Sequence, residues 1–110
     1  MSMKRRITYI SGPITGWPEE EAIEKFEHAE QLIRDRGEVP INPMKMCRLN
    51  MTYEECMRKD ITVMLLQADK IYMLKGFEES PGADLELDVA EMCGLDVEYE
   101  EDPDDDGDEI

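Results

Sequence analysis

The alternation of strand-like and helix-like segments constrains the fold of this chain more than any other feature. Four short segments rich in apolar and β-branched residues, at 6–11, 38–41, 70–74 and 95–99, are separated by three stretches with helical periodicity. Strands that alternate with helices favour a parallel sheet covered on both faces. Right-handed crossovers make the strand order 2-1-3-4 the simplest topology. The sequence therefore predicts a small doubly wound, Rossmann-like (flavodoxin-like) α/β fold with about four parallel strands.

Local signals mark the ends of the predicted helices. Acidic residues at 19–21 open the first helix, and residues 52–55 (Thr-Tyr-Glu-Glu) form a capping box at the start of the second. Ser80 is expected to be the N-cap of the third helix and Pro81 its first residue, and Gly94 is expected to end it. These signals agree with the proposed alternation.

The charge is unevenly distributed along the 110 residues. The net charge is −16, and ten of the 28 acidic side chains lie after residue 95. We expect one α/β domain at residues 1–99 and an acidic, disordered tail at 100–110. A chain this acidic should repel DNA and RNA backbones, so a small molecule is the expected ligand.

No targeting, membrane or metal-binding pattern stands out. The chain lacks an apolar run of membrane-spanning length and the apolar stretch of a signal peptide, so we expect a cytoplasmic protein that does not contact a membrane. Cys47, Cys56 and Cys93 follow no disulfide or metal spacing and are interpreted as buried or incidental thiols. His28, among Glu27 and Glu30, is expected to face solvent.

Glu86 lies on the apolar side of the third predicted helix. Val89, Ala90 and Cys93 follow it at offsets that share one helix face. A charge on such a face is costly unless it has a use, and a helix N-terminus favours the ionised form of a carboxylate. Glu86 therefore suits a nucleophile or a group that stabilises a cation.

Two glycine-bearing loops follow the first and third strands, at residues 12–16 and 75–82. In the predicted order these strands are neighbours, so the loops should face each other across one cleft at the carboxyl ends of the strands. The first loop matches neither a dinucleotide-binding nor a P-loop pattern, and it suits either a tight turn or a ligand cradle. Trp17, beside it, suits either stacking on an aromatic ligand or a structural role as a lid or hydrophobic staple.

Asp60 is the second unusual acid. It lies on or beside the apolar stripe of the second helix. From the residues alone, a rim position paired with Arg58, Lys59 or a nearby base is the favoured interpretation. The alternative is an acid that orients or protonates a substrate. Glu86, Asp60 and the two loops then form a carboxylate-centred site of the kind used in glycosyl transfer.

These residues together resemble the nucleoside 2-deoxyribosyltransferase superfamily, in particular a short, poorly characterised branch common in bacteria and their phages. The resemblance covers residues 6–95. No single motif is specific, but the ordered set of motifs is. The motifs are Tyr9-Ile10-Ser11-Gly12-Pro13-Ile14-Thr15-Gly16, Asn42-Pro43, Asp60-Ile61, Ala68-Asp69 and Gly82-Ala83-Asp84-Leu85-Glu86.

The resemblance implies an N-glycosidic bond chemistry. In that family a Glu attacks C1′ of a deoxyribosyl group and displaces the base, which implies that Glu86 is the nucleophile and Asp60 the acid near the base. It implies a homo-oligomer. From the residues themselves we expect no cofactor or metal. The substrate-binding residues that the resemblance implies are Tyr9, Gly12, Pro13, Ile14, Thr15, Ser80 and Gly82.

The phosphorylation state of the substrate stays open. Ser80 stands where transferases of the family carry an Asp, and it resembles the phosphate-contacting Ser of deoxynucleoside 5′-monophosphate N-glycosidases. Thr15, however, stands where those hydrolases have an Arg. Transfer and hydrolysis are both compatible with the residues. The alternatives are a nucleotide-binding module without turnover and, more weakly, a protein-interaction role for the tail at 100–110.

Overall fold

The computed structural model describes residues 5–14, 16–47 and 50–101. Over these residues the chain forms a parallel sheet in the order β2-β1-β3-β4. The predicted doubly wound fold and strand order are confirmed. The strands are β1 (Ile7–Ser11), β2 (Val39–Ile41), β3 (Lys70–Met73) and β4 (Asp96–Tyr99), the helices are α1 (Glu19–Asp35), α2 (Tyr53–Gln67) and α3 (Pro81–Met92), and the 3₁₀ turns are η1 (Pro43–Lys45) and η2 (Phe77–Glu79).

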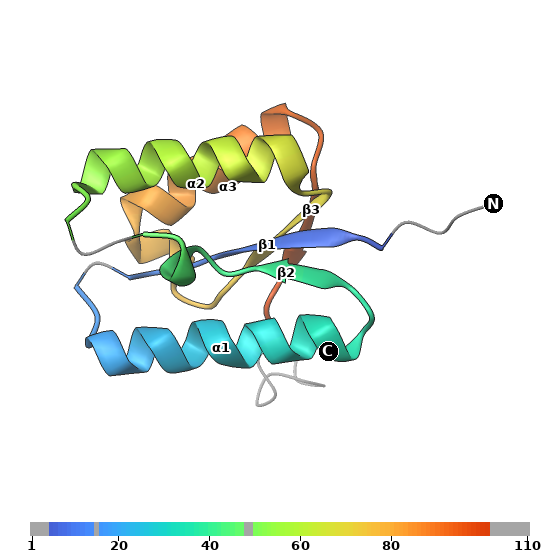
Figure 1. Ribbon diagram of the computed structural model, residues 1–110, viewed down its shortest axis with the longest axis horizontal. Helices are drawn as coiled ribbons and strands as arrows, with labels where there is room; N and C mark the ends of the chain where they lie inside the picture. Colours follow the sequence, from blue (N-terminus) through green and yellow to red (C-terminus); the bar gives the residue numbers. More distant parts are fainter. Residues whose placement is uncertain (1–4, 15, 48–49, 102–110) are drawn as a thin grey trace, which may run out of the picture.

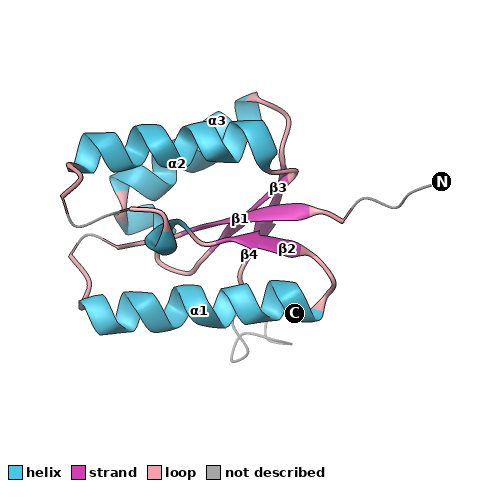
Figure 2. Ribbon diagram, viewed as in Figure 1, coloured by secondary structure: helices cyan, strands magenta, loops and turns pink. Residues whose placement is uncertain are grey.

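Helices cover both faces of the sheet. α1 lies on one face, and α2 and α3 lie together on the other (Figures 1 and 2). Alternate side chains of β1 enter opposite cores: Tyr9 packs on the α2/α3 side and Ile10 on the α1 side. Both cores are built mainly from aliphatic, aromatic and methionine side chains. No helix of the described chain is long and apolar enough to cross a membrane.

The predicted helix signals are confirmed where the structure describes them. The Thr52 side chain accepts from the Glu55 backbone and the Glu55 side chain accepts in return, which completes the capping box. The Ser80 hydroxyl accepts from the Ala83 N–H at 3.2 Å, and Pro81 is the first residue of α3. Gly94 has a φ of +84°, as expected of a glycine that ends a helix.

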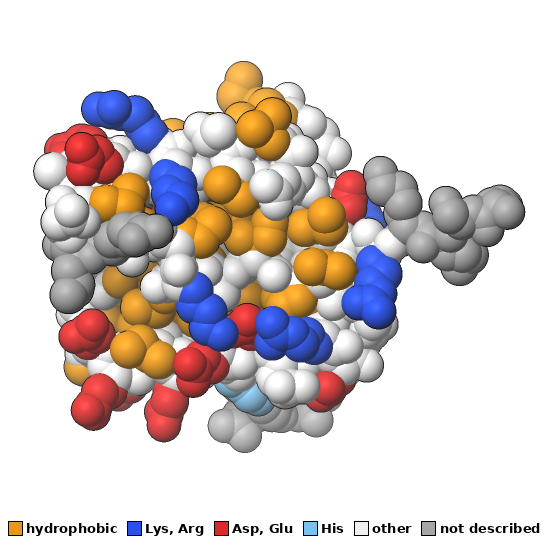
Figure 3. Space-filling view, viewed as in Figure 1, with side chains coloured by type: hydrophobic (Ala, Val, Ile, Leu, Met, Phe, Trp, Pro, Cys, Tyr) orange, Lys and Arg blue, Asp and Glu red, His pale blue; other side chains and the backbone are white. Residues whose placement is uncertain are grey.

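The exposed side chains follow the amphipathic pattern only in part. His28 is exposed, as predicted, but its neighbour Glu30 is buried. Met64 of α2 is fully buried, whereas Tyr53 at the start of the same helix is exposed. Figure 3 shows hydrophobic side chains gathered across the middle of one face, between α1 and the α2 layer. The α2 layer therefore leaves apolar surface beside the carboxyl ends of the strands.

The loops after β1 and β3 touch at the carboxyl edge of the sheet. The Leu74 N–H donates to the Ser11 carbonyl at 2.7 Å, and a Cβ added at Gly12 would lie 2.7 Å from the Leu74 Cβ. Only a residue without a side chain fits this close approach. The two loops therefore lie side by side, as the strand order predicts.

Candidate active site

Glu86 is held between two hydroxyl groups of β1. It lies in α3 with 6% of its surface exposed. The Tyr9 hydroxyl donates to Oε2 at 2.8 Å, and the Ser11 hydroxyl donates to Oε1 at 2.6 Å. Residues 9 and 11 point to the same face of the strand because side chains alternate with a period of two. Each carboxylate oxygen thus has one fixed donor.

The environment of Glu86 makes it hard to ionise. Burial raises its pKa to about 7, the hydrogen bonds from Ser11 and Tyr9 lower it, and the charge of Asp60 raises it. None of the ion pairs formed by the described residues includes Glu86. A carboxylate with this pKa exchanges its proton near neutral pH, which is common among catalytic groups.

Asp60 is buried in α2 with 6% of its surface exposed, so the interpretation as a rim residue is wrong. The Cys47 thiol is its hydrogen-bond donor, with an S···O distance of 3.9 Å. Burial raises the pKa of Asp60 to about 6, while the Cys47 hydrogen bond and the Lys59 charge lower it. Reasoning from residues close in the sequence missed the Cys47–Asp60 hydrogen bond, because the thiol comes from the segment after η1.

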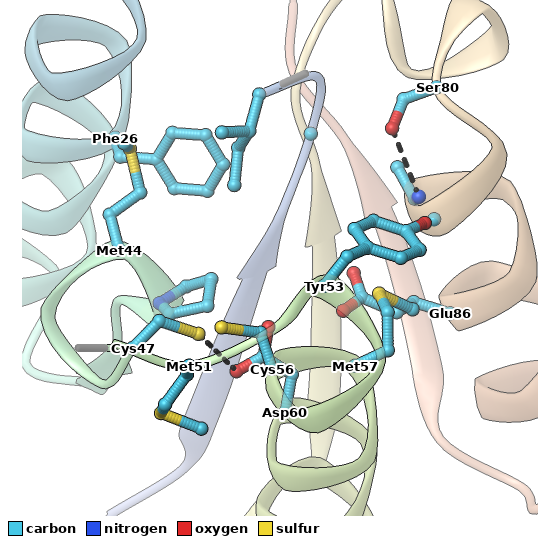
Figure 4. Close-up of a pocket in the computed structure, with 15 residues that line it drawn as sticks. Phe26, Met44, Cys47, Met51, Tyr53, Cys56, Met57, Asp60, Ser80 and Glu86 are labelled. Atoms are coloured by element: carbon cyan, nitrogen blue, oxygen red, sulfur yellow. Dashed lines mark hydrogen bonds between the residues drawn. The ribbon is translucent and has the colours of Figure 1, made fainter. Parts of the chain in front are cut away.

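Both carboxylates line one cavity of about 240 Å³ (Figure 4). The cavity lies among the loop after β1, η1 and the N-terminal parts of α2 and α3. Its wall is mostly apolar, and among the described lining residues Asp60 and Glu86 are the charged ones. The larger apolar side chains of the wall are Ile14, Phe26, Pro43, Met44, Met51, Tyr53 and Met57. The space therefore joins two proton-exchanging acids to a surface suited to a flat, uncharged ring.

Most residues predicted to bind a substrate meet at this cavity. Gly12, Ile14, Ser80 and Gly82 line it. Tyr9 reaches the site through Glu86. Thr15 lies outside the described residues, so its predicted role stays a prediction.

Pro13 and Trp17 do not belong to the cavity wall. Pro13 is buried, and its Cγ lies 3.4 Å from where a Cβ on Gly76 would stand. The Trp17 ring lies 3.3 Å from the same position and carries the Lys25 ammonium group 5.1 Å from its centroid. Of the two roles open to Trp17, this position favours covering the loops over stacking within the cavity.

Gly82 allows the close contact of α3 with α2. A Cβ at this position would lie 2.9 Å from the Tyr53 hydroxyl and 3.2 Å from the Met57 sulfur. Ser80, two residues earlier, lines the cavity while its oxygen caps the helix, so its hydroxyl proton is available to a ligand.

Sequence reasoning missed three groups at the site. Ser11 carries a signal that could have found it, because it lies two positions after Tyr9 on the same strand face. Cys47 and Cys56 both line the cavity, but nothing in their spacing brings them together. No cluster of three His, Cys, Asp or Glu side chains suited to a metal ion occurs within the part of the chain that the structure describes.

Comparison with known proteins places the fold. The model of the family described as "Domain of unknown function (DUF4406)" matches residues 6–99. A solved structure of a 2-deoxyribosyltransferase from the psychrotolerant bacterium Bacillus psychrosaccharolyticus is similar, with a TM-score of 0.66 and 19% sequence identity over 84% of this chain and 70% of that one. No curated protein matches by sequence. The structural likeness shows that the chain has the nucleoside 2-deoxyribosyltransferase-like fold.

Proposed function

The chain belongs to the DUF4406 family, and we propose that this member cleaves or exchanges the N-glycosidic bond of 2′-deoxynucleosides or their 5′-monophosphates. The observation that carries the proposal is Glu86, a buried carboxylate fixed by two hydroxyl donors at a cavity that holds a second buried acid. The fold shared with a 2-deoxyribosyltransferase makes a nucleoside the first substrate class to consider.

In this proposal Glu86 is the nucleophile. Its ionised form attacks C1′ of the deoxyribosyl group as the bond to the base breaks, and a glycosyl-enzyme intermediate forms. Tyr9 and Ser11 hold the carboxylate in place and stabilise the charge that it carries before the attack. With a pKa of about 7, a large share of Glu86 is ionised at neutral pH.

Asp60 is the acid that serves the departing base. Its pKa of about 6 leaves a protonated fraction near neutral pH, and its carboxyl group can donate that proton to the base as the glycosidic bond breaks. Water or a second base then attacks C1′ and releases Glu86. Glu86 and Asp60 thus divide the work of nucleophile and acid.

The cavity wall favours an uncharged nucleoside over a 5′-monophosphate. The described lining residues include no Lys, Arg or His, and the two charged groups are acidic. A phosphate would meet the Ser80 hydroxyl and the first N–H groups of α3, without a cationic partner among those residues. We expect kcat/KM to be higher for deoxynucleosides than for their monophosphates.

The test is incubation with each deoxynucleoside and 5′-monophosphate, with and without a free acceptor base. Chromatography measures release or exchange of the base, and mass spectrometry of acid-quenched protein detects deoxyribose on Glu86. Glu86→Ala should lose both signals. The proposal fails if no product forms at high protein concentration or if Glu86→Ala is as active as the wild type. Tight binding without turnover in calorimetry would instead support a nucleotide-binding module.

A further inference from the structure

Two thiols from different elements meet in the wall of the cavity. Cys47 follows η1, and Cys56 lies in the first turn of α2. Figure 4 shows their sulfur atoms pointing toward each other, and a hydrogen bond between the two side chains contributes to the high pKa of Cys47. Both side chains are partly exposed, so a small molecule can reach them through the cavity. Cys93 lies exposed at the C-cap of α3, away from this wall.

We propose that Cys47 and Cys56 are a reversible disulfide site that reacts with small-molecule disulfides such as oxidised glutathione, and that its closure withdraws the thiol donor from Asp60. The position of Cys56 is fixed before any reaction, because its N–H donates to the Thr52 carbonyl at 3.0 Å in the first backbone turn of α2. The bond would join the loop after η1 to the start of α2. It would therefore cross-link two parts of the cavity wall.

The chemistry balances with one oxidant molecule. Burial, assisted by Cys56 and Asp60, raises the pKa of Cys47 to about 12, so Cys56 makes the first attack. A Cys56–glutathione bond forms and one glutathione leaves as its thiol. The Cys47 sulfur then attacks the Cys56 sulfur, and the second glutathione leaves. Two electrons pass from the protein sulfurs to glutathione disulfide, and the two thiol protons end on the released glutathione molecules.

The Cys47–Cys56 disulfide would change the surroundings of Asp60 and leave the hydrogen bonds of Glu86 unchanged. The Cys47 thiol is the donor to Asp60 and stabilises its ionised form. A disulfide sulfur carries no proton, so Asp60 loses that stabilisation and keeps only the effect of Lys59. Glu86, which also faces this space, keeps its hydrogen bonds from Tyr9 and Ser11. Oxidation should therefore act on the acid and leave the anchoring of the nucleophile intact.

The experiment uses Cys93→Ser protein, which retains the pair and removes the exposed thiol. After treatment with oxidised glutathione, intact-mass analysis should show the loss of two hydrogens, and peptide mapping should place the bond between Cys47 and Cys56. Adding Cys47→Ser should instead trap Cys56 as a stable glutathione adduct. Dithiothreitol should reverse both products.

A second measurement follows Asp60 directly, by carbon-13 NMR titration of labelled aspartate in the reduced and oxidised protein. The pKa of Asp60 should be higher in the oxidised form. The proposal is overturned if no Cys47–Cys56 bond forms, if the intact pair retains a glutathione adduct, or if the pKa of Asp60 is the same in both forms. None of these readouts depends on turnover, so failure of the proposed enzymatic function would not be mistaken for failure of this site.

Discussion

Two buried carboxylates on opposite faces of the sheet have opposite electrostatic surroundings. Glu30 of α1 is 5% exposed and Glu86 of α3 is 6% exposed. Burial alone would raise the pKa of both. For Glu30, hydrogen bonds from Lys45 and Asn42 and the charges of Lys45 and Arg34 lower the pKa below its usual value. For Glu86, hydroxyl donors offset burial only in part, and the pKa stays at about 7.

The comparison shows that a buried carboxylate stays available for reaction when it has no cationic partner. Glu30 accepts from Lys45 at 2.9 Å, which ties α1 to η1, and from Arg34 at 3.0 Å within α1, so both contacts are structural ion pairs. Glu86 is anchored as firmly by Tyr9 and Ser11, but by neutral groups. Its charge is therefore available to a developing cation at a sugar carbon.

The largest expected effect is on catalytic rate, which should depend on Glu86 and not on Glu30. Glu86→Gln should lower the rate of base release or exchange by about 10³-fold or more, because the amide has no charge with which to attack C1′. Glu30→Gln, the matched control, should retain most of the activity of folded protein. Steady-state assays on both variants check this. Equal losses in the two variants would remove the functional distinction between the sites.

The second effect is on the pH dependence of stability. The folded protein binds the Glu86 proton more tightly than the unfolded chain, since the pKa rises from 4.5 to about 7. The free energy of unfolding therefore falls as pH increases through that interval. Glu86→Gln cannot ionise and does not lose this stability. Its free energy of unfolding should exceed that of the wild type by up to about 3 kcal/mol at pH 8, with little difference at pH 4.

Urea unfolding of both proteins across this pH range measures the difference. A Glu86→Gln variant that is less stable than the wild type at pH 8 would contradict the raised pKa of Glu86. The same measurement on Glu30→Gln supplies the contrast, because that carboxylate has a lowered pKa.

Glu30→Gln should destabilise the fold by about 2 kcal/mol at pH 7, because Lys45 and Arg34 lose a charged partner. Both cations are about half exposed, so water screens part of the loss. The stability that Glu30 contributes is present at neutral pH and is lost as pH falls through its lowered pKa in the folded protein. Denaturation at pH 7 and pH 3 tests this, and an undiminished difference at pH 3 would contradict the assignment.

The sequence predicts the fold well because its signals are local or follow from chirality. The capping box at Thr52, the Ser80-Pro81 helix start and the alternation of segments need only neighbouring residues, and right-handed crossovers supply the strand order. Glu86 could also be found, because helical periodicity puts it on a buried face.

The same periodicity would have identified Glu30, which lies between Phe26 and Ile33 on a buried face. The two acids differ in their hydrogen-bond and ion-pair partners. Partners of each acid come from other parts of the fold, since Lys45 lies in η1 and Ser11 in β1. The burial of Asp60 and its bond to Cys47 likewise depend on a loop that packs against α2. Sequence reasoning therefore singled out Glu86 and Asp60 as unusual acids but could not establish the burial of Asp60 or the ionisation of either carboxylate.

The smallest effect tests how far neutral donors can replace a cation. Tyr9→Phe and Ser11→Ala each remove one of the two hydrogen bonds that favour ionised Glu86. Each should raise the pKa of Glu86 by about one unit, since a hydrogen bond to a charged group is worth about 1.5 kcal/mol. The acid limb of the kcat/KM profile should move to higher pH by the same amount, and carbon-13 NMR of labelled glutamate should report the shift without turnover. Because the two donors bind different oxygens, the shifts should add in the double variant, and a double variant with an unshifted pKa would mean that the hydroxyls merely fill space beside Glu86.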